Sequence, residues 1–318
     1  MKRTIPIALL ISLLPLIAFA QGGRSFGGTG SITNEVSVNT GSNEVTIADG
    51  AEVSVTSIPS ISVTNLLDDG VEIAAGNVNG WKAVNKFGRS LNVDAAKTDI
   101  WDGANDTTDQ KIWVCPTNAQ VHNIASSAVL DSNTATGAWT LQVYGLTSWD
   151  TKETSEIVTL EGTNLVATEK AYVIIHRMKV VTSGTNINLG NITATASVQD
   201  SLTAMILALE GQTQMAIYGI PSTQCAYLPE YYASMNRSGG ATALLDVTLL
   251  VNTDPDAQTV PFLVKSTHGA QANGSSNFDH AFYPYFRIPG PAIIKVQGFG
   301  STTDLDVSAG FDLILVDN

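Results

Sequence analysis

The sequence predicts an all-β fold: a β-sandwich or jelly-roll-like body behind an N-terminal arm of β-repeats. From Lys111 to the C-terminus, short runs of alternating apolar and polar residues are separated by turn residues. No amphipathic helical pattern longer than about three turns interrupts these runs. Charged residues make up only 14% of the 318-residue chain, against about 25% in an average soluble protein. Many short strands joined by polar turns favour a sandwich over an α/β fold.

Residues 1–20 have the pattern of a secretory leader. Lys2-Arg3 is a positive n-region, Ile5–Phe19 is apolar, and Ala18-Phe19-Ala20 supplies the small residues of a cleavage site. The apolar run is too short for a transmembrane helix, which needs about 20 residues. We therefore expect no stable membrane span once the leader is removed. The alternative is an uncleaved hydrophobic N-terminus that packs in an assembly.

Residues 21–30 read as a Gly-rich linker and residues 31–79 as a β-repeat arm. Short alternating segments recur every 8 or 9 residues: NEVSV from Asn34, NEVTI from Asn43, EVSV from Glu52 and ISV from Ile61. A module of such short strands is too thin to bury a core of its own. It must therefore lie on a neighbour or stack in an oligomer. It is either a shaft or attachment arm, or a plain β-meander at the domain edge.

The predicted body spans residues 80–318. In Gly80–Asn92 the spacing of Trp81, Val84 and Phe87 by three predicts a short helical turn or an irregular anchor. The acidic loop Asp94–Gln110 follows. Farther on, Gly211–Arg237 reads as two strands joined by a turn at Pro221-Ser222-Thr223. The other expected strands are Ala138–Tyr144, Ser155–Glu161, Ala171–Val181, Ile192–Val198, Ala204–Leu209, Ala243–Val251, Phe262–Ser266, Phe282–Ile288, Ile293–Gly298 and Gly310–Val316.

The charge pattern and the motifs argue against several function classes. A net charge of −13 with 16 scattered basic residues is unsuited to binding nucleic acid, which needs clustered Lys and Arg. The sequence has no nucleophile elbow, P-loop, HExxH or CxxC. Glu153 and Glu156 read as a solvated strand edge rather than a glycosidase pair. His176 reads as a strand-face residue and His280 as a structural residue of an aromatic loop. With no catalytic motif and no catalytic candidate among these residues, we expect that the protein is not an enzyme.

The acidic loop carries a candidate Ca²⁺ site. Hard oxygen ligands lie within 11 residues there, and Ca²⁺ prefers such ligands, although the spacing is not that of an EF-hand. The alternative is a solvated loop without metal. The candidate ligands are Asp99, Asp102, Asn105, Asp106 and Asp109.

Two further groups of residues are candidates for special roles. Cys115 and Cys225 either form one disulfide in an oxidising compartment or remain two separate buried thiols. The aromatic run from Phe278 to Phe286 is either a sugar-stacking surface or part of the core or a subunit interface. Within it, Phe278, Tyr283 and Tyr285 are the candidates for contact with a ligand or a second subunit.

Several segments, in colinear order over residues 80–318, resemble β-rich structural proteins of tailed phages of the marine-phage type. The segments are GWKAVNKFGRSLNVD (Gly80–Asp94), IWDG (Ile100–Gly103), a first strand pair in Ile124–Leu146, ETSEIVTLEGT (Glu153–Thr163), YVIIHRMKVVTSGT (Tyr172–Thr185), the hairpin GQTQMAIYGIP and CAYLPEYYASMN, and the closing strand DLDVSAGFDLILVDN (Asp304–Asn318). The resemblance implies a non-enzymatic virion protein of the head-fibre, decoration, collar or tail-associated kind. It brings no catalytic residues with it.

This resemblance sets our expectations of partners and location. We expect a homo-oligomer, with a trimer favoured by analogy with phage fibres. Other virion proteins are expected partners, with a host-surface glycan as a further candidate. The location is the virion, or the periplasm or cell exterior if the leader is cleaved. The alternative function is a secreted carbohydrate-binding or adhesive β-sandwich module.

Overall fold

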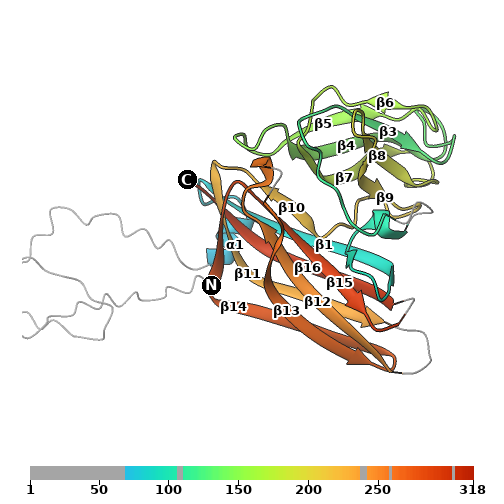
Figure 1. The fold of residues 1–318 in the computed structure, drawn as a ribbon. Helices are drawn as coiled ribbons and strands as arrows, with labels where there is room; N and C mark the ends of the chain where they lie inside the picture. Colours follow the sequence, from blue (N-terminus) through green and yellow to red (C-terminus); the bar gives the residue numbers. More distant parts are fainter. Residues whose placement is uncertain (1–68, 106–109, 237–241, 258–259, 303–304) are drawn as a thin grey trace, which may run out of the picture. The chain divides into compact units, whose positions relative to one another are not determined.

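The computed structural model describes residues 69–318 except 106–109, 237–241, 258–259 and 303–304 (Figure 1). The chain divides after Thr64, and every described residue belongs to the unit that begins at Asn65. The leader, the linker and the repeats Asn34–Thr64 lie outside the described residues. A short helix, α1 (Asp69–Ala74), precedes the strands. None of the helices in the described part is long and apolar enough to cross a membrane.

A first β-sandwich contains both ends of the described body. Sheet A has the order β1 (Trp81–Val93), β16 (Leu305–Asp317), β11 (Gln224–Asn236) and β14 (Ser275–Pro289). Sheet B has the order β10 (Ile217–Ile220), β15 (Ala292–Gly300), β12 (Ala243–Asn252) and β13 (Leu263–Ala272), and β2 (Thr98–Asp99) also pairs with β15. Neighbouring strands are antiparallel. The predicted all-β, sandwich-like fold is therefore confirmed.

A second β-sandwich is inserted between β2 and β10 (Figure 1). Sheet C has the order β6 (Val166–Ala167), β3 (His122–Ser126), β8 (Ile192–Ala196) and β9 (Leu202–Ile206). Sheet D has the order β5 (Thr154–Thr159), β4 (Ala138–Leu146) and β7 (Ile174–Ser183). Short 3-10 helices lie at Asp102–Asn105 and Pro255–Ala257. The body thus contains two sandwiches where the sequence predicted one.

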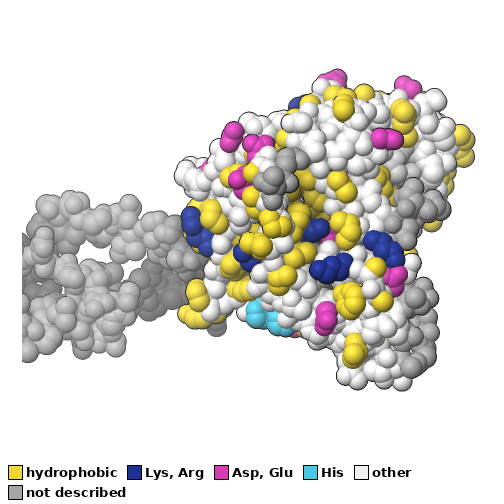
Figure 2. Space-filling model, viewed as in Figure 1, with side chains coloured by type: hydrophobic (Ala, Val, Ile, Leu, Met, Phe, Trp, Pro, Cys, Tyr) yellow, Lys and Arg dark blue, Asp and Glu magenta, His cyan; other side chains and the backbone are white. Residues whose placement is uncertain are grey.

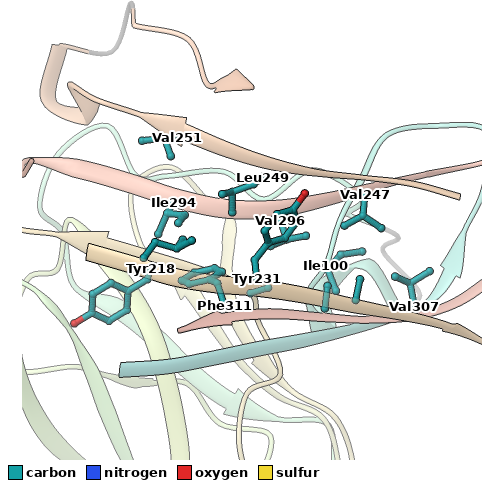
Figure 3. Packing of buried hydrophobic residues seen from close by; sticks show 14 of the residues in the cluster. Ile100, Tyr218, Tyr231, Val247, Leu249, Val251, Ile294, Val296, Val307 and Phe311 are labelled. Carbon is teal, nitrogen blue, oxygen red and sulfur yellow. The ribbon is translucent and has the colours of Figure 1, made fainter. Parts of the chain in front are cut away.

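Each sandwich has its own hydrophobic core. In the first, Phe311 of β16 and Tyr231 of β11 face Leu249 of β12 and Ile294 of β15 (Figure 3). Alternate residues of β16 point inward, as its burial pattern shows, because successive side chains of a strand project to opposite faces. The second core gathers Trp101, Trp113 and residues of sheets C and D, together with Ile217 and Ile293 of sheet B.

Segment 80–92 differs from its prediction, because it forms the strand β1 rather than a helical turn. It pairs with β16 from Trp81 to Val93. A spacing of three places Trp81 and Phe87 on one face of a strand and Val84 on the other. Trp81 and Phe87 are accordingly exposed, while Val84 packs against the first core. Three residues spaced by three therefore did not require a helix.

The two strands of Gly211–Arg237 exist, but they do not form a hairpin. β10 pairs with β15 in sheet B, whereas β11 pairs with β14 and β16 in sheet A. The turn at Pro221-Ser222-Thr223 thus carries the chain from one sheet to the other. Ile124–Leu146 behaves in the same way, since β3 belongs to sheet C and β4 to sheet D. Both predicted strand pairs are wrong in their pairing.

Candidate functional site

Polar side chains from distant parts of the chain meet where β1 approaches β7. Lys82 and Lys86 come from β1, Glu153 precedes β5, His176 lies on β7 and Tyr218 on β10. They line a cavity of about 270 Å³. Figure 2 shows lysine and arginine side chains in a band across the middle of the visible face. We call Lys82, Lys86, Glu153, His176 and Tyr218 the β1–β7 cluster.

Glu153 and His176 form the centre of this cluster. The Nε2 of His176 lies 2.7 Å from Oε2 of Glu153, and Nζ of Lys82 lies 2.7 Å from Oε1. The Tyr218 hydroxyl donates a longer hydrogen bond, 3.3 Å, to Oε2. Burial alone would raise the pKa of Glu153, but the hydrogen bonds and charges of His176 and Lys82 hold it well below its usual value. Burial lowers the pKa of His176, and the hydrogen bond and charge of Glu153 oppose this change.

Lys86 is the most unusual residue of the cluster. Its side chain is buried, and its Nζ donates to the backbone carbonyl of His176 at 2.5 Å. Burial, followed by the positive charge of Arg177, lowers the pKa of Lys86 to about 7, while the charge of Glu153 opposes this change. Lys86 therefore loses its proton near neutral pH, far below the pH at which an exposed lysine does so.

This chemistry favours a structural role for the cluster. His176 is only 1% exposed, and its Nε2 is committed to Glu153. Among the described residues that line the cavity there is no serine, threonine or cysteine to act as a nucleophile. The expectation that Glu153 lies on a solvated edge is wrong, because its side chain is 21% exposed and doubly paired. Glu156 is also half-buried, and its carboxylate accepts the backbone N–H groups of the loop at 169–170.

Most of this cluster could not be predicted from the sequence. His176 lies on a strand, as expected, but its partners are 23 and more residues away in the chain. One signal was present: Lys86 occupies an inward-facing position of an alternating strand, where a charged residue is unusual. That signal was hidden because the segment was not identified as a strand.

Asp99, the first candidate Ca²⁺ ligand, is fully buried and paired with protein groups. Its Oδ2 lies 2.6 Å from Nζ of Lys295 and accepts the backbone N–H of Trp113, while its Oδ1 accepts Nε2 of Gln297. Both of its oxygens therefore have protein partners.

The other candidate ligands are engaged elsewhere or lie outside the described residues. Asp102 accepts the backbone N–H of Gln214 at 2.7 Å, and burial raises its pKa well above the usual value. Asn105 bonds the backbone at Leu91 and Arg89, and Asp106 and Asp109 are not among the described residues. Across the described ranges, no group of three or more His, Cys, Asp or Glu side chains is placed to hold a metal.

The two cysteines are separate thiols, not a disulfide. Sγ of Cys115 donates to the carbonyl of Val173 at 3.4 Å, and Sγ of Cys225 lies 3.6 Å from the carbonyl of Ile288. Burial raises the pKa of Cys115 to about 12, so this group stays a protonated thiol. Of the two alternatives drawn from the sequence, the structure has two separate thiols, of which Cys225 is buried and Cys115 is half-buried.

The aromatic run lies on β14, the edge strand of sheet A, and its side chains alternate in direction. Tyr283 is 100% exposed and Tyr285 is 52% exposed, whereas Phe278, Phe282 and Phe286 are partly buried against the first core. Phe278 therefore faces inward, unlike the other two candidates. His280, expected in a loop, is on the strand.

Inward-facing rings of β14 meet a histidine of β13, the edge strand of sheet B. The His268 ring centroid lies 4.5 Å from that of His280 and 5.0 Å from that of Phe278. Tyr231 of β11 packs beside them at 5.5 Å from Phe278. All three rings of β13 and β14 remain half-buried rather than buried. We call Tyr231, His268, Phe278, His280 and Phe282 the edge cluster.

A comparison with protein-family models finds no match, and a comparison with curated proteins finds none either. The geometry of the chain and its sequence therefore carry the functional argument.

Proposed function

We propose that this chain is a non-enzymatic structural protein that acts by assembling with further copies of itself. The edge cluster is the observation that carries the proposal. There, the two sheets of the first sandwich end in adjacent strands whose inner aromatic side chains are only partly covered. The resemblance of residues 80–318 to tailed-phage structural proteins supports placing this assembly in a virion, as a head-fibre, decoration, collar or tail-associated protein.

The edge strands favour a protein partner for two physical reasons. β13 pairs on one side with β12, and β14 pairs on one side with β11, so each has an unpaired edge within the described structure. Unpaired backbone N–H and C=O groups recruit further strands. A partner that covered the half-buried Phe278 and Phe282 would remove more of their apolar surface from water, which stabilises the complex.

A second copy of the chain is the partner that best fits these edges. Closed symmetric self-association is the commonest arrangement of soluble oligomers. The repeats of the arm also carry a valine- and isoleucine-rich alternation that needs a covering surface. A homo-oligomer, with a trimer favoured, satisfies both demands.

Light scattering on the full chain tests this proposal. We expect an oligomer at tens of micromolar, and we expect His280→Lys to weaken its association at least about tenfold, because an added ammonium between apolar rings is costly to bury. Val198→Lys is the matched control, since Val198 is 85% exposed and lies outside the edge cluster. Circular dichroism of both variants confirms that they fold.

Two results would contradict the proposal in different ways. A monomeric full chain at tens of micromolar would remove the assembly function altogether. An oligomer that His280→Lys and Val198→Lys affect equally would retain assembly but exclude the edge cluster as its interface.

A further inference from the structure

Sheet A carries a second feature: a hollow of about 260 Å³ across all four of its strands, whose lining includes Phe278 of the edge cluster. The strand register places its residues in two rows. One row runs Phe87, Gly310, Tyr232, Asp279, and the next runs Ser308, Ser234, Asn277. Residues directly opposite one another on adjacent strands project to the same face. These side chains therefore form one continuous platform on β1, β16, β11 and β14, which lie side by side (Figure 1).

Gly310 shapes the floor of this platform. A Cβ at position 310 would lie 2.5 Å from the hydroxyl oxygen of Tyr232, so the phenol end of Tyr232 lies directly over the glycine. The Tyr232 hydroxyl is then 3.4 Å from Nδ2 of Asn85. Phe87, on the other side of Gly310, is 37% exposed. The platform thus presents two aromatic side chains, and the phenol end of Tyr232 covers the glycine between them.

Polar groups surround these rings without hydrogen bonds to the described protein. Ser234, Asn277, Asp279 and Ser308 are exposed or half-exposed, and their side chains form no hydrogen bond among the described residues. The neighbouring polar pairs differ, because Arg89 binds Asp306 at 2.6 Å and Asn85 donates to Asp312 at 2.5 Å. Polar side chains at the rim are therefore satisfied by one another, and those at the hollow remain available.

We infer that this platform, the sheet A hollow, binds a neutral sugar. A sugar ring has an apolar C–H face that can pack on an aromatic ring, and hydroxyl edges that need both donors and acceptors. Phe87 and Tyr232 supply the apolar surface. Serine hydroxyls, an amide and a carboxylate supply donors and acceptors, held on a rigid sheet.

Charge and size narrow the class of sugar. Asp279 is the one charged side chain among the described residues that line the hollow, and the whole chain has a net charge of −13. A carboxylate in the site repels sialylated, uronic or sulfated sugars. The hollow is smaller than the about 300–1,000 Å³ of a typical drug-sized pocket. It therefore suits one or two neutral or N-acetylated sugar residues rather than a long chain.

This site lies beside the edge cluster, with which it shares Phe278. Of the predicted candidates Phe278, Tyr283 and Tyr285, it includes the first but not the two tyrosines. Those two tyrosines are exposed side chains on an edge strand, and neither lines the hollow. If the chain is a virion protein, the hollow gives it a means to hold a glycan of the host surface.

A glycan array probed with the full chain, followed by calorimetry with the strongest neutral disaccharide and with sialyllactose, tests the inference. We expect a dissociation constant in the millimolar range, about 4 kcal/mol of binding free energy, for a neutral sugar and none for sialyllactose. Phe87→Ala and Asp279→Asn should each weaken binding at least about tenfold. Asp246→Asn is the matched control, because Asp246 is exposed on β12 of sheet B.

Ser308→Trp provides a variant that does not depend on removing contacts. A bulky ring in the second row should fill the hollow and abolish binding, while thermal unfolding reports whether the sheet is intact. The inference is overturned if the array shows no neutral sugar bound. It is also overturned if sialylated sugars bind in preference, or if Ser308→Trp and Asp279→Asn bind as tightly as the unchanged protein.

Discussion

At the scale of single residues, Lys86 is where the fold bears its clearest electrostatic cost. It lies among Arg177, Lys82, His176 and Glu153, yet its ammonium has no carboxylate within hydrogen-bonding distance in the described structure. A pKa of about 7 in the folded chain, against its ordinary 10.5, corresponds to roughly 5 kcal/mol. Below pH 7 the folded state must bury that charge.

Lys86→Met should therefore stabilise the protein at low pH. Between pH 7 and 10.5 the unfolded chain binds the proton that folded Lys86 has lost, so the free energy of unfolding of the unchanged protein rises with pH. Methionine has no such proton, and this part of the rise should disappear. We expect Lys86→Met to be more stable by about 1–4 kcal/mol at pH 6, with the advantage shrinking towards pH 10. Urea unfolding at both values measures it.

Lys265→Met is the control for this prediction. Lys265 is exposed on β13, so its removal should leave the pH dependence of unfolding as it was. An advantage of Lys86→Met that is the same at pH 6 and pH 10 would mean that packing, and not the buried charge, separates the two proteins.

At the scale of elements, the sequence was a good guide to strands and a poor guide to their partners. The segments Ala138–Tyr144 and Ala243–Val251 coincide closely with β4 and β12, because local alternation reports which face of a strand is buried. Pairing depends on contacts between residues far apart in the chain, which alternation does not encode. For that reason the turn after Ile220 could be located from Pro221, while its passage from sheet B to sheet A could not.

Close approach between elements is equally invisible in sequence. A Cβ at Gly88 of β1 would lie 2.2 Å from the carbonyl oxygen of Ile100 and 2.5 Å from the backbone N of Ala216. Both of these atoms belong to backbone that cannot rotate away as a side chain does. Gly88 therefore lets β1 pack directly on the segment that leads into β10.

Gly88→Ala should destabilise the protein by about 3 kcal/mol or more, because one methyl group would force backbone apart. Gly269→Ala on β13 is the matched control, since the nearest atom to a Cβ there is a side-chain oxygen of Asp246 at 3.5 Å. Urea unfolding of the two variants measures the difference. Equal stabilities would show that β1 shifts to accept a side chain at position 88.

At the scale of the whole molecule, the candidate sites were harder to predict than the fold. The β1–β7 cluster takes its residues from four separate strands or loops, and the sheet A hollow takes its own from four strands that are distant in sequence. The acidic loop was a candidate Ca²⁺ site because its carboxylates are close in the chain. In the structure, Asp99 pairs with Lys295, and Asp102 accepts the backbone N–H of Gln214. A buried carboxylate is costly unless it is hydrogen-bonded or paired, so each one has its own protein partner.

The division of the chain after Thr64 leads to a prediction about its two parts. Both hydrophobic cores consist of residues from Val84 onward. A chain shortened to residues 65–318 should therefore keep the strand signal in circular dichroism and a cooperative unfolding transition. It should nevertheless associate more weakly than the chain with the repeats Asn34–Thr64, because their alternating valines and isoleucines need a surface to cover them.

Light scattering of the two chains over a range of concentrations separates the sources of assembly. We expect the longer chain to form the oligomer, with a mass of three copies favoured, at lower concentration than the shortened one. Equal association of the two would assign assembly to β13 and β14 alone and leave the repeats as a meander. If His280→Lys weakens the shortened chain further, the edge cluster and the repeats contribute separately, since independent interactions add in free energy.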